Sequence, residues 1–255
     1  AQEPPAPAEA LRAHAAVRDW VLRWAVPDQA PEAMPTVWGA SLTLRLDGRV
    51  IARSAAAGPD AVMETARSAL REARPKMEVP NDALADDAFA ALARRVTVSL
   101  ELYARPVPIP ASDLALPMAG CSPGAEALVV AAGQGADERV VISGVDAQLS
   151  RGVDPARELS ALAAEMTGDG ATALRPIGDL LADGLRFSRA PVVHTAMPFE
   201  GAAPVFLDRG GRRVAPTEIR TDTIRALANG VAAHLRARRW PGVERYGLAG
   251  DLRLA

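Results

Sequence analysis

One segment near the start of the chain constrains the fold more than any other, and it begins at Val37 and reads VWGASLTLRLDGRVIARSAAAG. Apolar residues recur at every second position from Trp38 to Leu46. Because side chains of a β-strand point alternately to the two faces of a sheet, this period predicts a half-buried strand. Asp47 and Gly48 follow, a pair typical of a two-residue hairpin turn. The segment therefore predicts an antiparallel hairpin.

The turn also predicts which residues face each other across the hairpin. In the expected register Leu46 faces Arg49, Leu44 faces Ile51, Leu42 faces Arg53 and Ala40 faces Ala55. Trp38, Leu42, Leu44 and Leu46 should then be buried on one face of the sheet.

The same register places the charge of Arg53 on the apolar face, and two interpretations of this residue are open. It is either an edge residue whose charged group reaches solvent, or a site residue that needs an anionic partner. Under the second interpretation Arg49, Arg53 and Ser54 form the polar wall of a binding cleft.

Composition excludes several classes of function. The 255 residues are 49% hydrophobic, enough for a folded core, and the net charge of -2 gives no field to hold nucleic acid or an anionic membrane. The single cysteine, Cys121, rules out an internal disulfide framework and a Cys-rich zinc site, and the histidines lack the spacing of metal ligands. We therefore expect no metal, no cofactor, no nucleic-acid partner and, without a long apolar run, no transmembrane segment.

Helical and strand periods alternate along the rest of the chain. A helical stripe before the hairpin comprises Ala10, Ala13, His14, Val17, Trp20, Val21 and Trp24. Capping residues or a first-position proline indicate later helices that start near Pro59, Asn81, Asp154 and Thr221. Strand periods cover 96–103, 126–144, 185–197 and 205–214, with Gly-rich turns inside the second and the last. The pattern predicts an α+β fold with a mainly antiparallel sheet, flanking helices, and helical extensions at both ends.

Three finer expectations concern burial and position. Pro191 interrupts a strand period and indicates an edge strand. The helix near Pro59 should bury Val62, Ala66, Ala69, Leu70 and Ala73. The last helix should turn inward Ile224, Leu227, Ala228, Val231 and Leu235.

The order of these elements resembles that of the AMMECR1 domain family. The matching segments, between about Val37 and Ala196, are VWGASLTLRLDGRV, a helix that ends near REARPKMEVP, RRVTVSLELYARPVPI, PGAEALVVAAG and a helix at DPARELSALAAEM. Family members carry a Gly-Cys-Ile-Gly motif in the second strand of the first hairpin. Here that strand reads VIARSAAAG, and the nearest residues are Ala52, Arg53 and Ser54. The resemblance implies an α+β fold with two unequal lobes around a cleft, and it implies no particular reaction.

A serine-hydrolase interpretation fits the sequence poorly. GCSPG matches the Gly-x-Ser-x-Gly elbow, with Ser122 as nucleophile and His194 or His234 as base. The elbow needs a strand before the serine, a helix after it, and a main-chain N–H on the next residue, which Pro123 lacks. We therefore interpret the segment as a loop and expect neither Cys121 nor Ser122 to perform covalent chemistry.

The sequence favours a non-catalytic binding or scaffold module with three parts: residues 1–35 form a Pro-rich start and packing helix, 36–196 the AMMECR1-like domain, and 197–255 a hairpin and helical extension. The expected partner is a small anionic ligand or a protein. One alternative is an enzyme that acts on a small anionic substrate in a cleft near Arg53 and Ser54. Another is the N-terminal part of a longer multidomain protein.

The chain starts with AQEPPAPAEA, which is typical of a chain cut by signal peptidase. We expect export to the periplasm or outside the cell, with a cytoplasmic location as the alternative.

Overall fold

The structure, a computed structural model, describes residues 4–32, 34–77, 85–116, 118–122, 124–209, 220–237, 246–247 and 253–254. The chain divides into two compact units, residues 1–210 and residues 211–255. The second unit contains helix α8 (Thr221–Ala237) and the short strands β9 (Tyr246–Gly247) and β10 (Arg253–Leu254), which pair with each other.

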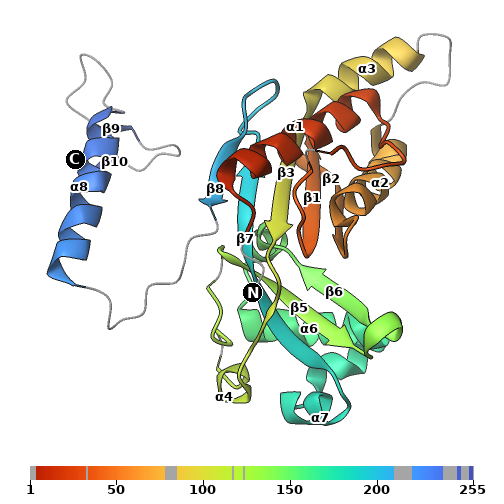
Figure 1. Cartoon of the computed structure of the whole chain (residues 1–255), viewed down its shortest axis with the longest axis vertical. Helices are drawn as coiled ribbons and strands as arrows, with labels where there is room; N and C mark the ends of the chain where they lie inside the picture. The colour runs from red at the N-terminus through yellow and green to blue at the C-terminus, as the bar shows by residue number, and fades with distance from the viewer. Residues whose placement is uncertain are drawn as a thin grey trace. The chain divides into compact units, whose positions relative to one another are not determined.

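The first unit combines strands and helices in the order expected for an α+β fold (Figure 1). Its strands are β1 (Gly39–Leu46), β2 (Arg49–Ala57), β3 (Val96–Tyr103), β4 (Val107–Pro108), β5 (Glu126–Ala132), β6 (Arg139–Ser143), β7 (Arg186–Ala196) and β8 (Val205–Arg209). Its α-helices are α1 (Pro7–Arg23), α2 (Ala61–Ala73), α3 (Ala85–Arg95), α4 (Ala111–Leu114), α5 (Val145–Arg151), α6 (Pro155–Thr167) and α7 (Ile177–Ala182). Three short 3-10 helices are η1 (Arg74–Met77), η2 (Gly135–Asp137) and η3 (Gly170–Leu174).

The strands form one sheet in the order β2-β1-β3-β7-β5-β6, and β4 and β8 also pair with β7. All pairings in it are antiparallel, which confirms the predicted fold class. Strands β2 and β6 lie at opposite ends of this order, yet they approach each other in space.

The first hairpin forms as predicted at its turn and departs from the prediction further along. Asp47 and Gly48 both have positive φ angles, 52° and 77°, as the two-residue turn requires, and Leu46 pairs with Arg49. A β-bulge between the turn and the middle of the hairpin then shifts the register by one residue. Arg53 consequently pairs with Thr43 rather than Leu42, so the predicted place of Arg53 on the apolar face is wrong.

The apolar face of β1 and β3 packs against helices α1 and α2. Leu42 and Leu44 are fully buried there, and Leu46 is half-buried at the edge of the same cluster. Trp38 lies outside β1 and packs with a different cluster around Tyr103, so its expected place on this face is wrong. The opposite face is also buried, because α5 and the segment that precedes it cover it.

Strand β7 pairs with four other strands, so the edge position predicted from Pro191 is wrong. Residues 186–191 pair with β5, and residues 192–196 pair with β3. Pro191 therefore lies where β7 changes partner. Its carbonyl oxygen accepts a bond from the Ala104 N–H, which follows the end of β3. Because the N–H and C=O of one strand residue point to the same side, the missing N–H of proline costs no bond to β5.

Most helix expectations are confirmed, with differences at the ends. Helix α1 buries its predicted stripe from Ala10 to Val21, whereas Trp24 is its C-cap and is only partly buried. Helix α2 buries all of its predicted residues but begins at Ala61, two residues after Pro59. The Asp154 carboxylate accepts a bond from the Arg157 N–H and caps α6, which ends at Gly168 in the left-handed conformation. The expected cap at Asn81 lies outside the described residues.

The inward face predicted for α8 is wrong where its side chains are described. Ile224 is 57% exposed and Ala228 is exposed. The side chains of Leu227, Val231 and Leu235 lie outside the described part.

A buried histidine makes the stability of the first unit depend on pH. His14 on α1 is 1% exposed, and its Nδ1 atom lies 2.9 Å from Oγ1 of Thr195 on β7. Its Nε2 atom is buried without a hydrogen-bond partner among the described residues. Burial, together with electrostatic interactions with Arg18 and His194, lowers the His14 pKa from 6.5 to about 4. His14 is therefore neutral in the folded protein at pH 7.

Acidification should destabilise the fold through His14. Between pH 6.5 and pH 4 the unfolded chain binds a proton that the folded one does not. The free energy of unfolding therefore decreases as the pH decreases, by about 3 kcal/mol over this window. Urea unfolding at a series of pH values measures this slope, and His14→Gln should be less sensitive. Equal slopes in the two proteins would contradict this account.

Candidate functional site

Helix α5 covers the polar face of the sheet and is held there by a buried carboxylate. Glu101 on β3 is 1% exposed, and its oxygens accept bonds from the main-chain N–H groups of Val145 and Asp146 at 2.7 and 2.8 Å. The Tyr103 hydroxyl donates a third bond at 2.9 Å. Burial and the Glu101 charge raise the Tyr103 pKa well above its ordinary value, so the hydroxyl keeps its proton. A side chain at Gly144 would collide with these groups, which fixes a glycine before the helix.

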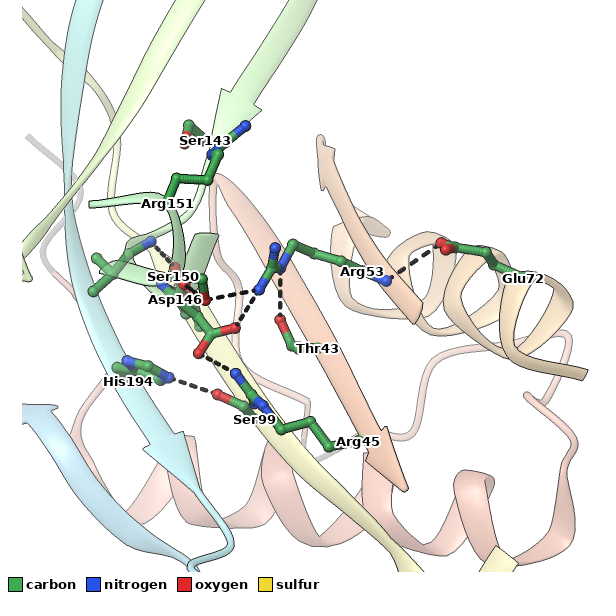
Figure 2. A network of polar contacts seen from close by, with 12 residues as sticks. Thr43, Arg45, Arg53, Glu72, Ser99, Ser143, Asp146, Ser150, Arg151 and His194 are labelled. Atoms are coloured by element: carbon green, nitrogen blue, oxygen red, sulfur yellow. Dashed lines mark hydrogen bonds and ion pairs between the residues drawn. The ribbon is translucent and has the colours of Figure 1, made fainter. Parts of the chain in front are cut away.

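Asp146 on α5 supplies the internal anionic partner of Arg53. Its two carboxylate oxygens bind Nη2 of Arg45 at 2.5 Å and Nη2 of Arg53 at 3.1 Å. Figure 2 shows the carboxylate between the two guanidinium groups, with Thr43 below Arg53 and Ser150 beside it. Arg53 donates to the hydroxyl oxygens of both, at 3.4 and 3.1 Å. The bulge in β2 thus brings Arg53 to the side of the sheet where its partners lie.

The Asp146 carboxylate stays charged despite its partial burial. Burial alone raises its pKa, but the hydrogen bond and the charge of Arg45, with hydrogen bonds from Thr43 and Arg53, outweigh that effect. The net pKa lies below the ordinary value. Two arginines therefore share one ionised carboxylate.

A pocket of about 300 Å³ lies where strands β2 and β6 approach each other, and we call it the edge pocket. Its wall consists of Ser41, Arg53, Ser54, Ala55, Ala56, Ala57, Val140, Val141, Ile142, Gly144, Ala147, Arg151, Leu162 and Glu165. Arg151 is already bound to the buried carboxylate of Glu158 and to the Ser143 hydroxyl. Arg53 and Arg151 line the pocket, and each already forms an ion pair: Arg53 with Asp146, which it shares with Arg45, and Arg151 with Glu158.

A second pocket, of about 600 Å³, lies on the other side of Asp146 and is more apolar. Its wall includes Arg45, Ser99, Asp146, Met197, Phe199, Val205 and Leu207, and we call it the β8 pocket. The Ser99 hydroxyl oxygen lies 2.7 Å from Nε2 of His194, and both side chains are buried. The two arginines that share Asp146 thus line different pockets.

The structure brings together two of the three predicted site residues. Arg53 and Ser54 both line the edge pocket, although their side chains start from opposite faces of β2, since Ser54 pairs with Leu42. Arg49 is exposed at the hairpin turn and lines a separate pocket beside Lys76.

The candidate serine and cysteine occupy a structural loop. Cys121 is buried, and its Sγ atom contacts the Ala119 carbonyl oxygen at 3.2 Å. The Ser122 N–H donates to Glu126 at 2.7 Å, and Glu126 is also bound by Arg189. Among the described residues, the element that follows Ser122 is strand β5 and not a helix.

The sequence patterns do not identify Asp146 and Arg151 as site residues, because α5 has only seven residues and a weak helical pattern, VDAQLSR.

The described residues hold no cluster of three or more His, Cys, Asp or Glu side chains that would bind a metal ion. None of the described helices is both long enough and apolar enough to cross a bilayer.

No protein-family model matches this chain, and no curated protein matches it. Among solved structures, the crystal structure of the uncharacterized protein PH0010 from Pyrococcus horikoshii is similar, with a TM-score of 0.50 and 13% sequence identity. The similarity covers 77% of this chain and 93% of that one. At this identity it shows a shared fold and carries no information about activity.

Proposed function

We propose that the chain is an AMMECR1-like domain protein that acts as a non-catalytic binding module, and that its ligand occupies the edge pocket. The observation that carries the proposal is the state of the pocket wall: Arg53 and Arg151 line it, and their guanidinium groups are already held in ion pairs with Asp146 and Glu158. Such a wall is held in place before a ligand arrives, which reduces the entropy cost of binding.

The chemistry of the wall favours binding over catalysis. A guanidinium group stays protonated in proteins, so Arg53 and Arg151 donate hydrogen bonds but do not transfer protons. The carboxylates of Asp146 and Glu158 are bound to these arginines, and the remaining carboxylate of the pocket, Glu165, is exposed on α6. The wall can therefore orient a polar ligand without breaking a bond in it.

The order of the elements supports the AMMECR1-like assignment. The hairpin, the following helix and the exit strand β3 occur in the family's order. The strand that carries the family's Gly-Cys-Ile-Gly motif is β2, where Arg53 and Ser54 stand instead and line the edge pocket. In this proposal β2 lines the cleft, and Arg53 and Ser54 replace the motif and contact the ligand.

Chemical-shift mapping tests the proposal. Amide spectra are recorded with acetate, inorganic phosphate, glutarate and a library of short peptides as probes. We expect a probe to shift the amide signals of Arg53, Ser54 and Ala55 together, and Ala55→Trp, which fills the pocket, should abolish the shifts. Ala182→Trp, on the exposed surface of α7, serves as the control and should leave them intact. Shifts that cluster elsewhere, or survive in Ala55→Trp, would refute the site.

A second candidate function, covalent hydrolysis, rests on Ser99, which lines the β8 pocket and contacts His194. A serine hydroxyl at 2.7 Å from an imidazole nitrogen has the spacing of a nucleophile and its base. A fluorophosphonate probe should then label Ser99 in the native protein and fail to label His194→Gln. If the probe does not label the native protein, covalent hydrolysis by Ser99 is ruled out.

A further inference from the structure

The edge pocket lies beside two strands that approach each other without pairing. Residues of β2 and β6 have Cα atoms within 8 Å of each other, and no ladder of hydrogen bonds joins these two fully described strands. An added strand would hold β2 and β6 roughly 9–10 Å apart, so the gap is too narrow for a polypeptide. The pocket volume of about 300 Å³ instead matches the size of sites for small molecules.

The hydrogen bonds of β2 show which of its main-chain groups face outward. The Gly58 N–H donates across the hairpin, to the residue before β1, at 2.8 Å. Because the bonding direction alternates along an antiparallel strand, Arg53, Ala55 and Ala57 turn their main-chain groups away from β1. The Arg53 N–H accordingly donates to the Glu72 carboxylate on α2, at 3.3 Å (Figure 2). The main-chain groups of Ala55 and Ala57 therefore face outward in the pocket wall.

The same reasoning applies to β6 through its neighbours. The Ile109 N–H donates to the Phe187 carbonyl oxygen on β7, on the side away from β5. Val130, the partner of Phe187 on β5, therefore bonds toward β6. The outward-facing residues of β6 in the pocket wall are then Val140 and Ile142. In the described part of the chain, no hydrogen bond reaches these outward groups or those of the two β2 alanines. The pocket thus offers main-chain donors and acceptors together.

The charged side chains at the pocket balance one another. Three basic and three acidic groups lie in the wall or in ion pairs with it: Arg45, Arg53, Arg151, Asp146, Glu158 and Glu165. The site therefore has no net charge that would select an anion or a cation. A ligand with one positive and one negative group has the same balance, so it leaves no charge uncompensated.

Both signs of charge remain available to such a ligand. Among the described residues, no acceptor takes up Nη1 of Arg53, and no basic group pairs with the exposed Glu165 carboxylate. Arg53 belongs to β2, whereas Glu165 belongs to α6, which packs on β6. The rest of the wall is mostly small or aliphatic and suits a short aliphatic body, and it consists largely of Ala55, Ala56, Ala57, Val140, Val141, Ile142, Ala147 and Leu162.

We infer that the edge pocket binds a small aliphatic amino acid in its zwitterionic form. Arg53 donates to the carboxylate of the amino acid, and Glu165 accepts from its ammonium group. The outward main-chain groups of β2 and β6 complete the hydrogen bonds. This inference rests on the proposed function and specifies the class of ligand.

The test compares each amino acid with analogues that lack one of its two charges. L-valine and its isomer δ-aminovalerate present the same two groups close together and far apart. Isovalerate and isobutylamine are the single-charge analogues of valine, and valerate and butylamine are those of δ-aminovalerate. In amide titrations of the whole chain, we expect one of the two amino acids to bind about tenfold or more tightly than both of its analogues. The isomer that binds shows the spacing of the two charges.

A substitution at the acidic group tests the ammonium contact. Glu165→Gln keeps the size of an exposed side chain and removes its charge, so the amino acid should bind about fivefold or more weakly while its carboxylate analogue binds as before. Glu64→Gln, an exposed position on α2 outside the pocket wall, is the matched control and should leave both affinities unchanged.

The outcomes separate this inference from the proposed function. A single-charge analogue that binds as tightly as its amino acid, or native affinity in Glu165→Gln, would overturn zwitterion binding and leave the binding function standing. The same conclusion follows if another probe shifts the edge-pocket signals and neither amino acid does. If no amino acid, analogue, small anion or peptide perturbs the pocket, the proposed function itself fails.

Discussion

Glu101→Ala should lower the free energy of unfolding by about 3–6 kcal/mol, because the buried carboxylate accepts two main-chain N–H groups at the start of α5 and each bond to a charged group contributes about 1.5–3 kcal/mol. Without it, the N–H groups of Val145 and Asp146 and the Tyr103 hydroxyl lose their acceptor in a dry environment. Urea unfolding followed by circular dichroism measures the loss.

Glu101→Gln is the matched control because it keeps the shape of the side chain and one acceptor oxygen. Its loss should be smaller than that of Glu101→Ala, since one main-chain bond survives. A Glu101→Ala protein within about 1 kcal/mol of the native stability would show that α5 is held by other contacts.

Leu44→Ala should lower the free energy of unfolding by about 2–5 kcal/mol. Leu44 is fully buried between the sheet and its helices, so the substitution removes apolar contacts and leaves a cavity that the packed surroundings fill only in part. The measurement is again urea unfolding.

Val50→Ala offers the comparison within the same hairpin, because Val50 is 44% exposed and its truncation leaves no cavity. Its effect should be within about 1 kcal/mol. Similar losses for the two variants would contradict the assignment of Leu44 to the core.

The sequence predicts regular elements well and their small irregularities poorly. The alternation from Ala40 to Leu46 and the Asp47-Gly48 turn predict the hairpin correctly, because burial of one face and turn geometry are local properties. The bulge in β2 is not marked by any residue type, and it decides on which face Arg53 lies. A one-residue shift moves a strand side chain to the opposite face, so the expected surroundings of Arg53 were wrong although the element was right.

The candidate site depends on contacts between residues far apart in the sequence. Arg53 meets Asp146 only because α5 lies on the polar face of the hairpin, and α5 is placed there by Glu101. Alternation in β3 predicts that Glu101 points away from the apolar core, but it does not predict a helix that buries this second face. The β2 and β6 edges approach each other through the topology of the sheet, which local patterns do not encode.

The measurement that tests the central claim most directly is the affinity of a probe that shifts the edge-pocket amide signals for three proteins: the native chain, Ala55→Trp and Ala182→Trp. If the edge pocket is the binding site, the indole at position 55 occupies the space of the ligand, and affinity should fall by about tenfold or more in Ala55→Trp. It should remain native in Ala182→Trp, where the same side chain is added on the exposed surface of α7. Native affinity in Ala55→Trp, in a protein that melts at the native temperature, would contradict the account.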